Sequence, residues 1–253
     1  MRIASLVPSL TELLFSLGLD DLIVARTGFC IHPRERVRNV PKVGGTKDID
    51  IDALLATKPT HLIVNIDENR REAIAELRPH IPEIVVTHPL VPDDNLILYR
   101  EFGRLFDRTN AAAALAAGYQ SSRDELATAT SNARPLNVLY LIWKDPWFTV
   151  SRSTYVSAML AGANLVTLPA TSEARYPTLT SDDEAWHDAD AILLSSEPYS
   201  FRQKHLDELQ RTLDPKKPIL LADGELISWY GSRAIAGLRY LRALRAQIDA
   251  KVA

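Results

Sequence analysis

The chain has 253 residues and a formal net charge of −3, from 29 basic and 32 acidic residues. This length is enough for one large α/β domain or for two lobes that each bury a core, and we take two lobes as the working model. The near balance of charge argues against a nucleic-acid partner or an anionic membrane surface. The single cysteine, Cys30, excludes an internal disulfide and a metal cage built from several cysteines.

The N-terminal apolar run is too short for the hydrophobic region of a signal peptide, and it leads directly into strand-like sequence. No apolar stretch approaches the roughly 20 residues that span a bilayer, so we expect no membrane insertion. We therefore expect the chain, as given, to carry no export signal. We therefore expect a cytoplasmic protein if Met1 is the natural start.

Strands and helices alternate through residues 1–92. The apolar residues 3–7 predict a buried strand, and Ser9 followed by Glu12 predicts a capping box for a helix that Gly18 ends. Further strands are predicted at 22–25, 62–64 and 84–87, and further helices at 52–57 and 69–77. This alternation predicts a mostly parallel sheet in an N-terminal α/β lobe.

The next segment, residues 93–134, predicts one long connecting helix. Its apolar residues recur at helical spacing and lead into an alanine-rich continuation, with Asp107 to Asn110 as the place for a break. Pro135 ends the helix. A C-terminal α/β lobe follows over 135–253, with strands at 138–143, 191–194 and 219–222 and helices at 155–160, 204–213 and 233–251.

Aromatic side chains follow the predicted strands of the second lobe. In open parallel sheets ligands bind beyond the carboxyl ends of the strands. Three of the four tryptophans, Trp143, Trp147 and Trp229, fall in these segments, together with Tyr199 and Tyr230. Such rings suit a cleft that holds a bulky, partly apolar ligand, although they could instead fill an interface between the lobes.

Cys30 and His32 are two residues apart, so on an extended segment both side chains could face one metal. Two ligands do not make a metal site, and a buried thiol beside a hydrogen-bonded histidine is the alternative. The run Gly44-Gly45-Thr46-Lys47 lacks the full phosphate-loop pattern and predicts a tight turn that carries a lysine.

Acidic residues near predicted helix starts offer docking points for a basic partner, or else belong to solvated faces. The docking candidates are Glu68, Glu72 and Glu197.

Three segments resemble the class III, helical-backbone family of periplasmic substrate-binding proteins, and most closely its cobalamin-binding and other metal-chelate-binding members. They are Arg2 to Glu12, Val43 to Thr46, and Lys58 to Val64, and the similarity spans essentially the whole chain. The resemblance implies two Rossmann-like lobes joined by one long backbone helix, with mostly parallel sheets. It also implies a monomeric, non-enzymatic protein that captures a corrinoid, haem or ferric siderophore between the lobes for an ABC permease, with no covalently bound cofactor.

The same resemblance, with the strand-end positions, gives the expected site. We expect the chelate to contact Pro8, Ser9, Arg26, Phe29, Cys30, His32, Asn65, Trp143, Trp147, Tyr199, Trp229 and Tyr230. Any bond from the protein to the metal would be a single axial one, from His32 or Cys30.

Two departures leave alternatives open. The family's importer members are exported or lipid-anchored, whereas we expect neither a signal peptide nor an N-terminal lipidated cysteine here. In addition, the cobalamin receptors place an acidic docking residue where this sequence has Arg71, with Glu72 beside it. The alternatives are a cytoplasmic enzyme that handles a corrinoid or tetrapyrrole and a chelate sensor on the same architecture. A cleft cluster of Asp223, Glu197 and Glu225 with shifted pKa values would favour the enzyme.

Overall fold

The computed structural model describes residues 1–213 and 217–252. Its contacts divide the chain into two compact units. Unit 1 comprises Met1–Pro89, Asn95–Ala116 and Tyr230–Arg233, and unit 2 comprises Leu90–Asp94, Ala117–Trp229 and Ala234–Ala253. The boundaries expected from the sequence, at 92/93 and 134/135, stay a prediction.

Unit 1 contains a four-stranded sheet in the order β2-β1-β3-β4, and every neighbouring pair is parallel. Its strands are β1 (Ile3–Ser5), β2 (Ile23–Arg26), β3 (His61–Asn65) and β4 (Glu83–Thr87). Because all four run the same way, their carboxyl ends share one edge of the sheet. The parallel sheet predicted for this part of the chain is confirmed.

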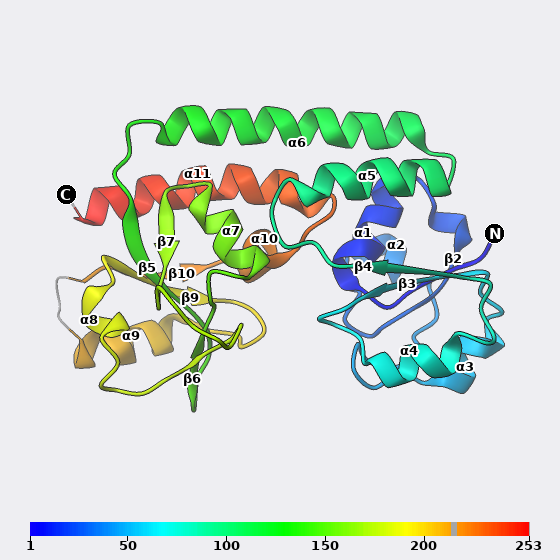
Figure 1. The fold of residues 1–253 in the computed structure, drawn as a ribbon, viewed down its shortest axis with the longest axis horizontal. Helices are drawn as coiled ribbons and strands as arrows, with labels where there is room; N and C mark the ends of the chain where they lie inside the picture. The colour runs from blue at the N-terminus through cyan, green and yellow to red at the C-terminus, as the bar shows by residue number, and fades with distance from the viewer. Residues whose placement is uncertain (214–216, 253) are drawn as a thin grey trace. The chain divides into compact units, whose positions relative to one another are not determined.

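Short helices cover this sheet on both faces, with α1 on one side and α3 and α4 on the other (Figure 1). They are α1 (Pro8–Ser16), the 3₁₀ helix η1 (Asp20–Leu22), α2 (Arg34–Val37), α3 (Ile51–Ala56) and α4 (Arg71–Leu77). Leu54 of α3 and Leu77 of α4 are fully buried against Leu62 of β3 in one apolar cluster. Burial of these side chains is what holds the two helices, each under eight residues long, on the sheet.

Helix α1 does not begin with the capping box that the sequence predicts. Val7 is the N-cap, Pro8 occupies the first turn, and no side chain caps the helix. Proline suits this position because the first turn leaves its amides unpaired in any case. Glu12 instead pairs with Arg233, so the capping-box prediction is wrong. The predicted stop is confirmed, since Gly18 adopts the left-handed conformation at φ +71°.

The predicted single connecting helix is two helices, α5 (Asp94–Leu105) and α6 (Thr109–Thr130). The break falls at Asp107, whose φ is +54°, and the amide of Arg108 donates to the carbonyl of Gly103 at 2.7 Å. A Cβ on Gly103 would come within 2.6 Å of the Ala112 side chain. The chain therefore turns at the predicted place, and glycine lets the first turns of α6 pack closely on α5.

Unit 2 contains a six-stranded mixed sheet in the order β10-β9-β5-β6-β8, with β7 paired to the first part of β5. The strands are β5 (Leu136–Trp143), β6 (Trp147–Thr149), β7 (Leu165–Thr167), β8 (Thr178–Leu179), β9 (Ala191–Ser195) and β10 (Ile219–Ala222). Strands β10, β9, β5 and β7 are parallel, whereas β6 and β8 pair antiparallel. The sequence did not predict β6, β7 and β8, because two or three residues are too few to show a period.

The helices of unit 2 pack on both faces of this sheet (Figure 1). They are α7 (Tyr155–Ala161), α8 (Ala185–Asp188), α9 (Gln203–Thr212), α10 (Gly224–Ser228) and α11 (Arg233–Val252). The core beneath α8 and α9 contains Trp186, Ile192 and Leu209. On the other face, the second half of α6 is bound to α11 by a hydrogen bond from Arg239 to Ser122 at 3.1 Å.

Within residues 1–213 and 217–252, no helix is both long enough and apolar enough to cross a membrane.

Candidate functional site

The strand-end edge of unit 1 exposes apolar side chains. Phe29 is 62% exposed and Ile31 is 42% exposed in the loop after β2, and Ile66 is 59% exposed directly after β3. Single exposed apolar side chains are common in folded proteins, whereas several at one place on the surface often mark an interaction site. Three of them at one sheet edge mark a surface that suits an apolar ligand. Of the three, only Phe29 was among the predicted ligand residues.

The loop that contains Phe29 is held by hydrogen bonds from a buried arginine, Arg26. The Arg26 guanidinium donates to the carbonyls of Thr27 and Cys30 at 3.1 and 3.0 Å, and to those of Val37 and Val40 at 2.9 and 3.2 Å. Arg26 is only 4% exposed. A planar guanidinium can satisfy several carbonyls at once, so Arg26 holds the loop from inside.

Cys30 is fully buried in this structure. Its sulfur accepts a hydrogen bond from Thr11 at 3.1 Å and lies 3.2 Å from the hydroxyl of Thr27. Burial raises the pKa of the Cys30 thiol, although both threonines act in the opposite direction. The thiol therefore stays protonated and out of reach of a ligand, which argues against Cys30 as an axial metal ligand.

His32 is half-buried, so it does not share the inaccessible position of Cys30. Across the two described stretches of the chain, no three His, Cys, Asp or Glu side chains lie close enough to hold a metal ion.

The glycine-rich loop before α3 is a tight turn, as the sequence predicts. Gly44 has φ +88°, and a Cβ there would overlap the carbonyl oxygen of Asp48. The loop carries Lys47, whose ammonium donates to the carbonyl of Asp67 at 2.6 Å. Asn69 connects the same region by donating to the carbonyls of Leu6 and Thr46. These bonds fix the loops that follow β1 and β3.

The segment Tyr230–Arg233 belongs to unit 1 although it lies late in the chain. The Tyr230 hydroxyl donates to Glu68 at 2.6 Å, and the guanidinium of Arg233 makes two hydrogen bonds to Glu12, of 2.7 and 2.8 Å. Burial and the Glu68 carboxylate raise the pKa of Tyr230 well above its usual range. Both predicted site residues here, Glu68 and Tyr230, therefore hold the segment in place.

The strand-end edge of unit 2 carries a connected group of rings, which we call the aromatic cluster: Trp143, Trp147, Trp186, Tyr199, Phe201 and His205. Trp143 packs edge-on against Tyr199 at 5.5 Å between ring centroids, and Trp147 stacks parallel to Phe201 at 6.0 Å. Trp143 is 41% exposed, whereas Trp147 is packed against the core. The cluster thus presents Trp143 to solvent and keeps Trp147 in a supporting position.

The predicted acids of unit 2 have partners of their own. The Trp229 indole, which is 8% exposed, donates to the Glu197 carboxylate at 2.9 Å. Asp223 caps α10 by accepting from the amide of Leu226. Glu197 and Asp223 therefore fix local structure.

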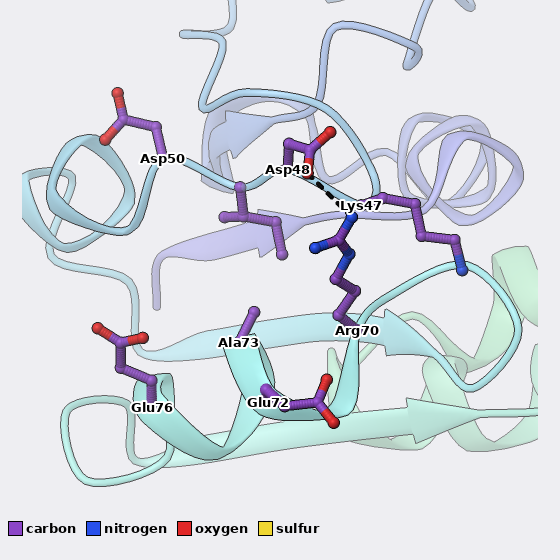
Figure 2. Close-up of a pocket in the computed structure, with 8 residues that line it drawn as sticks. Lys47, Asp48, Asp50, Arg70, Glu72, Ala73 and Glu76 are labelled. Atoms are coloured by element: carbon purple, nitrogen blue, oxygen red, sulfur yellow. Dashed lines mark ion pairs between the residues drawn. The ribbon is translucent and has the colours of Figure 1, made fainter.

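A groove of about 540 Å³ in unit 1 contains Glu72, the third predicted docking residue. Asp48 and Arg70 form an ion pair of 3.3 Å at its rim, and α4 contributes Glu72, Ala73 and Glu76 (Figure 2). The whole lining is Lys47, Asp48, Ile49, Asp50, Arg70, Glu72, Ala73 and Glu76. Four acids against two bases give the groove a net negative charge.

The predicted site residues thus fall into two groups. Phe29, His32, Trp143, Trp147 and Tyr199 are exposed or half-buried at strand ends. Pro8, Ser9, Arg26, Cys30, Asn65, Trp229 and Tyr230 are buried. Sequence reasoning did not select Ile31 and Ile66, although each lies in a segment that follows a strand.

Comparison with known proteins places this fold among binding proteins. A family model described as "Periplasmic binding protein" matches residues 3–213. The vitamin B12-binding protein of Pectobacterium atrosepticum is 21% identical over 198 residues, which are 76% of this chain and 71% of that protein.

Two solved structures share the fold over nearly the whole chain. The periplasmic vitamin B12 binding protein of Vibrio cholerae has a TM-score of 0.83 at 17% identity, covering 98% of this chain and 97% of that one. The periplasmic haem-binding protein of Roseiflexus sp. RS-1, without ligand, has a TM-score of 0.84 at 20% identity, covering 100% and 99%. The likeness confirms the predicted α/β architecture with parallel-rich sheets and a long helix.

Proposed function

Since the chain belongs to the periplasmic binding protein family, we propose that it binds a metal chelate of the corrinoid type through the strand-end residues of each unit. Membership also fits the prediction of a binding protein rather than an enzyme. The curated relative that binds vitamin B12 supports the choice of a corrinoid.

The observation that carries the proposal is the exposure of apolar side chains at the strand ends. Phe29, Ile31 and Ile66 give unit 1 an apolar surface, and Trp143 gives unit 2 an aromatic one. A bulky ring system can bury much of its apolar surface against such residues, and each Å² removed from water contributes about 25 cal/mol of favourable free energy. A small hydrophilic solute or a bare ion would gain little from them.

The metal would arrive inside its organic ligand. A bare transition metal needs several protein donors, and residues 1–213 and 217–252 bring no three candidate donors together. A corrin ring supplies its own equatorial donors, so it needs packing and hydrogen bonds rather than a protein cage. The half-buried His32 remains the proposed source of an axial bond, if the ligand takes one.

Five predicted residues are exposed or half-buried, and we assign direct ligand contact to four of them, Phe29, His32, Trp143 and Tyr199, with Ile31 and Ile66 added from their exposure. The fifth, Trp147, has a supporting role, because its ring packs on Phe201 and Trp186. The buried members, among them Arg26 and Trp229, act by holding the loops that carry the contacts.

The acidic groove is our proposed docking surface for a membrane partner. The family works with ABC permeases. Glu72 and Glu76 lie on one side of the groove, opposite Asp48 and Asp50 (Figure 2). This charge suits basic side chains on a partner, and Glu72 is more exposed than Glu68 or Glu197.

Calorimetric titration of the purified protein with cyanocobalamin, dicyanocobinamide, haemin and a ferric siderophore tests the ligand. We expect one-to-one binding of a corrinoid with the compound recovered unchanged. Trp143→Ala should weaken that binding by about 1 to 3 kcal/mol, and Leu221→Ala, another exposed apolar change in unit 2, should not. Tighter binding of haemin or the siderophore would overturn the corrinoid assignment, and a chemically altered corrinoid would overturn the binding-protein role.

Docking is tested separately by the double variant Glu72→Lys and Glu76→Lys. Corrinoid affinity should stay unchanged while uptake by cells that depend on this protein is lost, because the groove becomes positive. Asp124→Lys changes an exposed acid of unit 2 and serves as the matched control. Normal uptake with the double variant would exclude the groove.

A further inference from the structure

His205 occupies an enclosed position at the start of α9. It is 8% exposed and packs edge-on against two rings of the aromatic cluster, Tyr199 at 5.4 Å and Phe201 at 5.7 Å. Its Nδ1 lies 3.0 Å from the backbone amide of Arg202, and its Nε2 lies 3.3 Å from the Tyr199 hydroxyl. Both ring nitrogens are therefore engaged.

These contacts fix which nitrogen carries the proton. A backbone amide can only donate, so Nδ1 of His205 must accept and cannot hold a proton. The proton of the neutral ring is then on Nε2, which donates to the Tyr199 hydroxyl oxygen. One neutral histidine thus does two things: it caps the first turn of α9 and it orients Tyr199.

Tyr199 in turn packs against Trp143, the exposed member of the aromatic cluster. Its ring contacts Trp143 edge-on at 5.5 Å, and Trp143 has no other ring contact among the described residues. Trp143 is the exposed aromatic side chain to which the proposed function assigns ligand contact. The order of contacts is His205, Tyr199, Trp143.

Protonation of His205 would break its bond to the Arg202 amide and so displace the ring that orients Tyr199. A second proton would sit on Nδ1 and face the Arg202 amide, so that two donors point at each other. The charged groups around the ring are Lys204 and Glu208 on α9, Arg202 before it, and Lys144 from the β5–β6 turn. Lys144 is itself paired with Glu208 at 2.7 Å, so part of the negative charge near the ring is already balanced. Burial lowers the pKa of His205, the nearby lysines lower it further, and Glu208 opposes them.

We infer that His205 is a positioning residue for the ligand site: in its neutral form it orients Tyr199 and thereby Trp143, and acidification releases this support and weakens ligand binding. The inference rests on the proposed function, in which Trp143 contacts the ligand. It adds a dependence on pH through a residue that is not itself assigned to ligand contact. Because His32, another histidine, is assigned to the contact set, the affinities below are measured in a His32→Gln background, which serves as the reference protein.

The first test measures affinity for cyanocobalamin from about pH 8 to about pH 5, a range that brackets the ordinary histidine pKa of about 6.5. Because the folded-state pKa is lowered, affinity should be constant above that value and fall about five-fold below it, the loss expected for one hydrogen bond. His205→Gln should bind as the reference protein does at pH 8 and lose the pH dependence, because a glutamine amide can accept from Arg202 and donate to Tyr199 without titrating. His205→Ala should bind about five-fold more weakly at every pH.

His187→Gln is the matched control, since His187 is an exposed histidine of the same unit. It should leave the pH profile unchanged. A pH dependence that survives in His205→Gln would overturn the inference.

The second test needs no ligand. Near-ultraviolet circular dichroism reports the packing of the aromatic cluster, and the far-ultraviolet signal checks that the fold persists. We expect a reversible near-ultraviolet transition with a midpoint below about pH 6.5 in the wild type and in His187→Gln, and none in His205→Gln. If Trp143→Ala leaves affinity unchanged while this transition is present, the ligand assignment fails and the link from His205 to the cluster stands. If Trp143→Ala weakens binding but no transition occurs, the inference fails and the ligand assignment stands.

Discussion

Replacing Trp147 by alanine should destabilise the fold far more than it weakens ligand binding. Its ring packs against the core of unit 2, stacked on Phe201 at 6.0 Å and edge-on to Trp186 at 5.6 Å, with the Lys144 ammonium 5.8 Å from its centroid. A buried tryptophan removes about 150–250 Å² from water, and each ring pair adds about 0.5–1.5 kcal/mol. Substitutions of this kind cost about 3–5 kcal/mol, and since Trp147 is half-buried we expect about 3 kcal/mol.

Trp143→Ala is the internal comparison. Trp143 is 41% exposed and has a single ring contact within the described chain, so its removal should cost about 1 kcal/mol of stability. Urea denaturation followed by far-ultraviolet circular dichroism measures both variants, with the slope m checked for constancy. Calorimetry with cyanocobalamin on the folded variants supplies the affinities.

The two tryptophans should thus separate: Trp147→Ala loses stability and retains most affinity, and Trp143→Ala does the reverse. A Trp147→Ala protein that keeps wild-type stability but no longer binds would refute the reasoning, because the ring would then be ligand contact rather than core.

Three other predictions concern stability and reactivity. Gly44→Ala should destabilise by about 3 kcal/mol, because a Cβ at φ +88° would overlap backbone, whereas Gly18→Ala, at φ +71° with open space around it, should cost about 1 kcal/mol in the same urea assay. Arg233→Ala should cost about 3 kcal/mol of stability, because it leaves the mostly buried Glu12 carboxylate unpaired. The double variant Arg233→Ala and Glu12→Gln should recover part of this loss. If the double variant lost as much stability as Arg233→Ala alone, the result would argue against a stabilising ion pair. Cys30 should react with a thiol reagent only as fast as the protein opens, since burial raises its pKa, and fast labelling of the native protein would contradict its burial.

The sequence predicted most of the regular elements because their patterns are local. Strand β10 has the bounds that its apolar run predicts, α7 and α9 are within one residue of theirs, and Gly18 ends α1 through its own backbone freedom. The family resemblance, carried by three segments, is confirmed by the matching family model. The short strands β6, β7 and β8 escaped prediction because they form by pairing with β5 or with one another rather than by pattern.

The site residues were predicted from their position along the chain, after the strands. The sequence was least informative about which of these side chains are exposed. It identified the segments after the strands, but Phe29 and Cys30 are neighbours there and one is exposed while the other is fully buried. Trp143 and Trp147, four residues apart across a tight turn, also differ, since Trp143 is exposed and Trp147 is half-buried. Which side chain faces solvent depends on what the rest of the fold places against it.

The sequence by itself determined the α/β class and the alternation of elements, since propensity and period act over a few residues. The family followed from the resemblance of three segments. Only the tertiary structure decided the partners of the charged and polar groups. Glu12 was expected to cap its own helix, yet Arg233, far along the chain, takes it. His205 gave no signal in the sequence, because its role depends on Tyr199 and on the ring that Tyr199 meets. Hydrogen bonds and ion pairs form between groups that folding brings together, so their partners follow from packing and not from spacing along the chain.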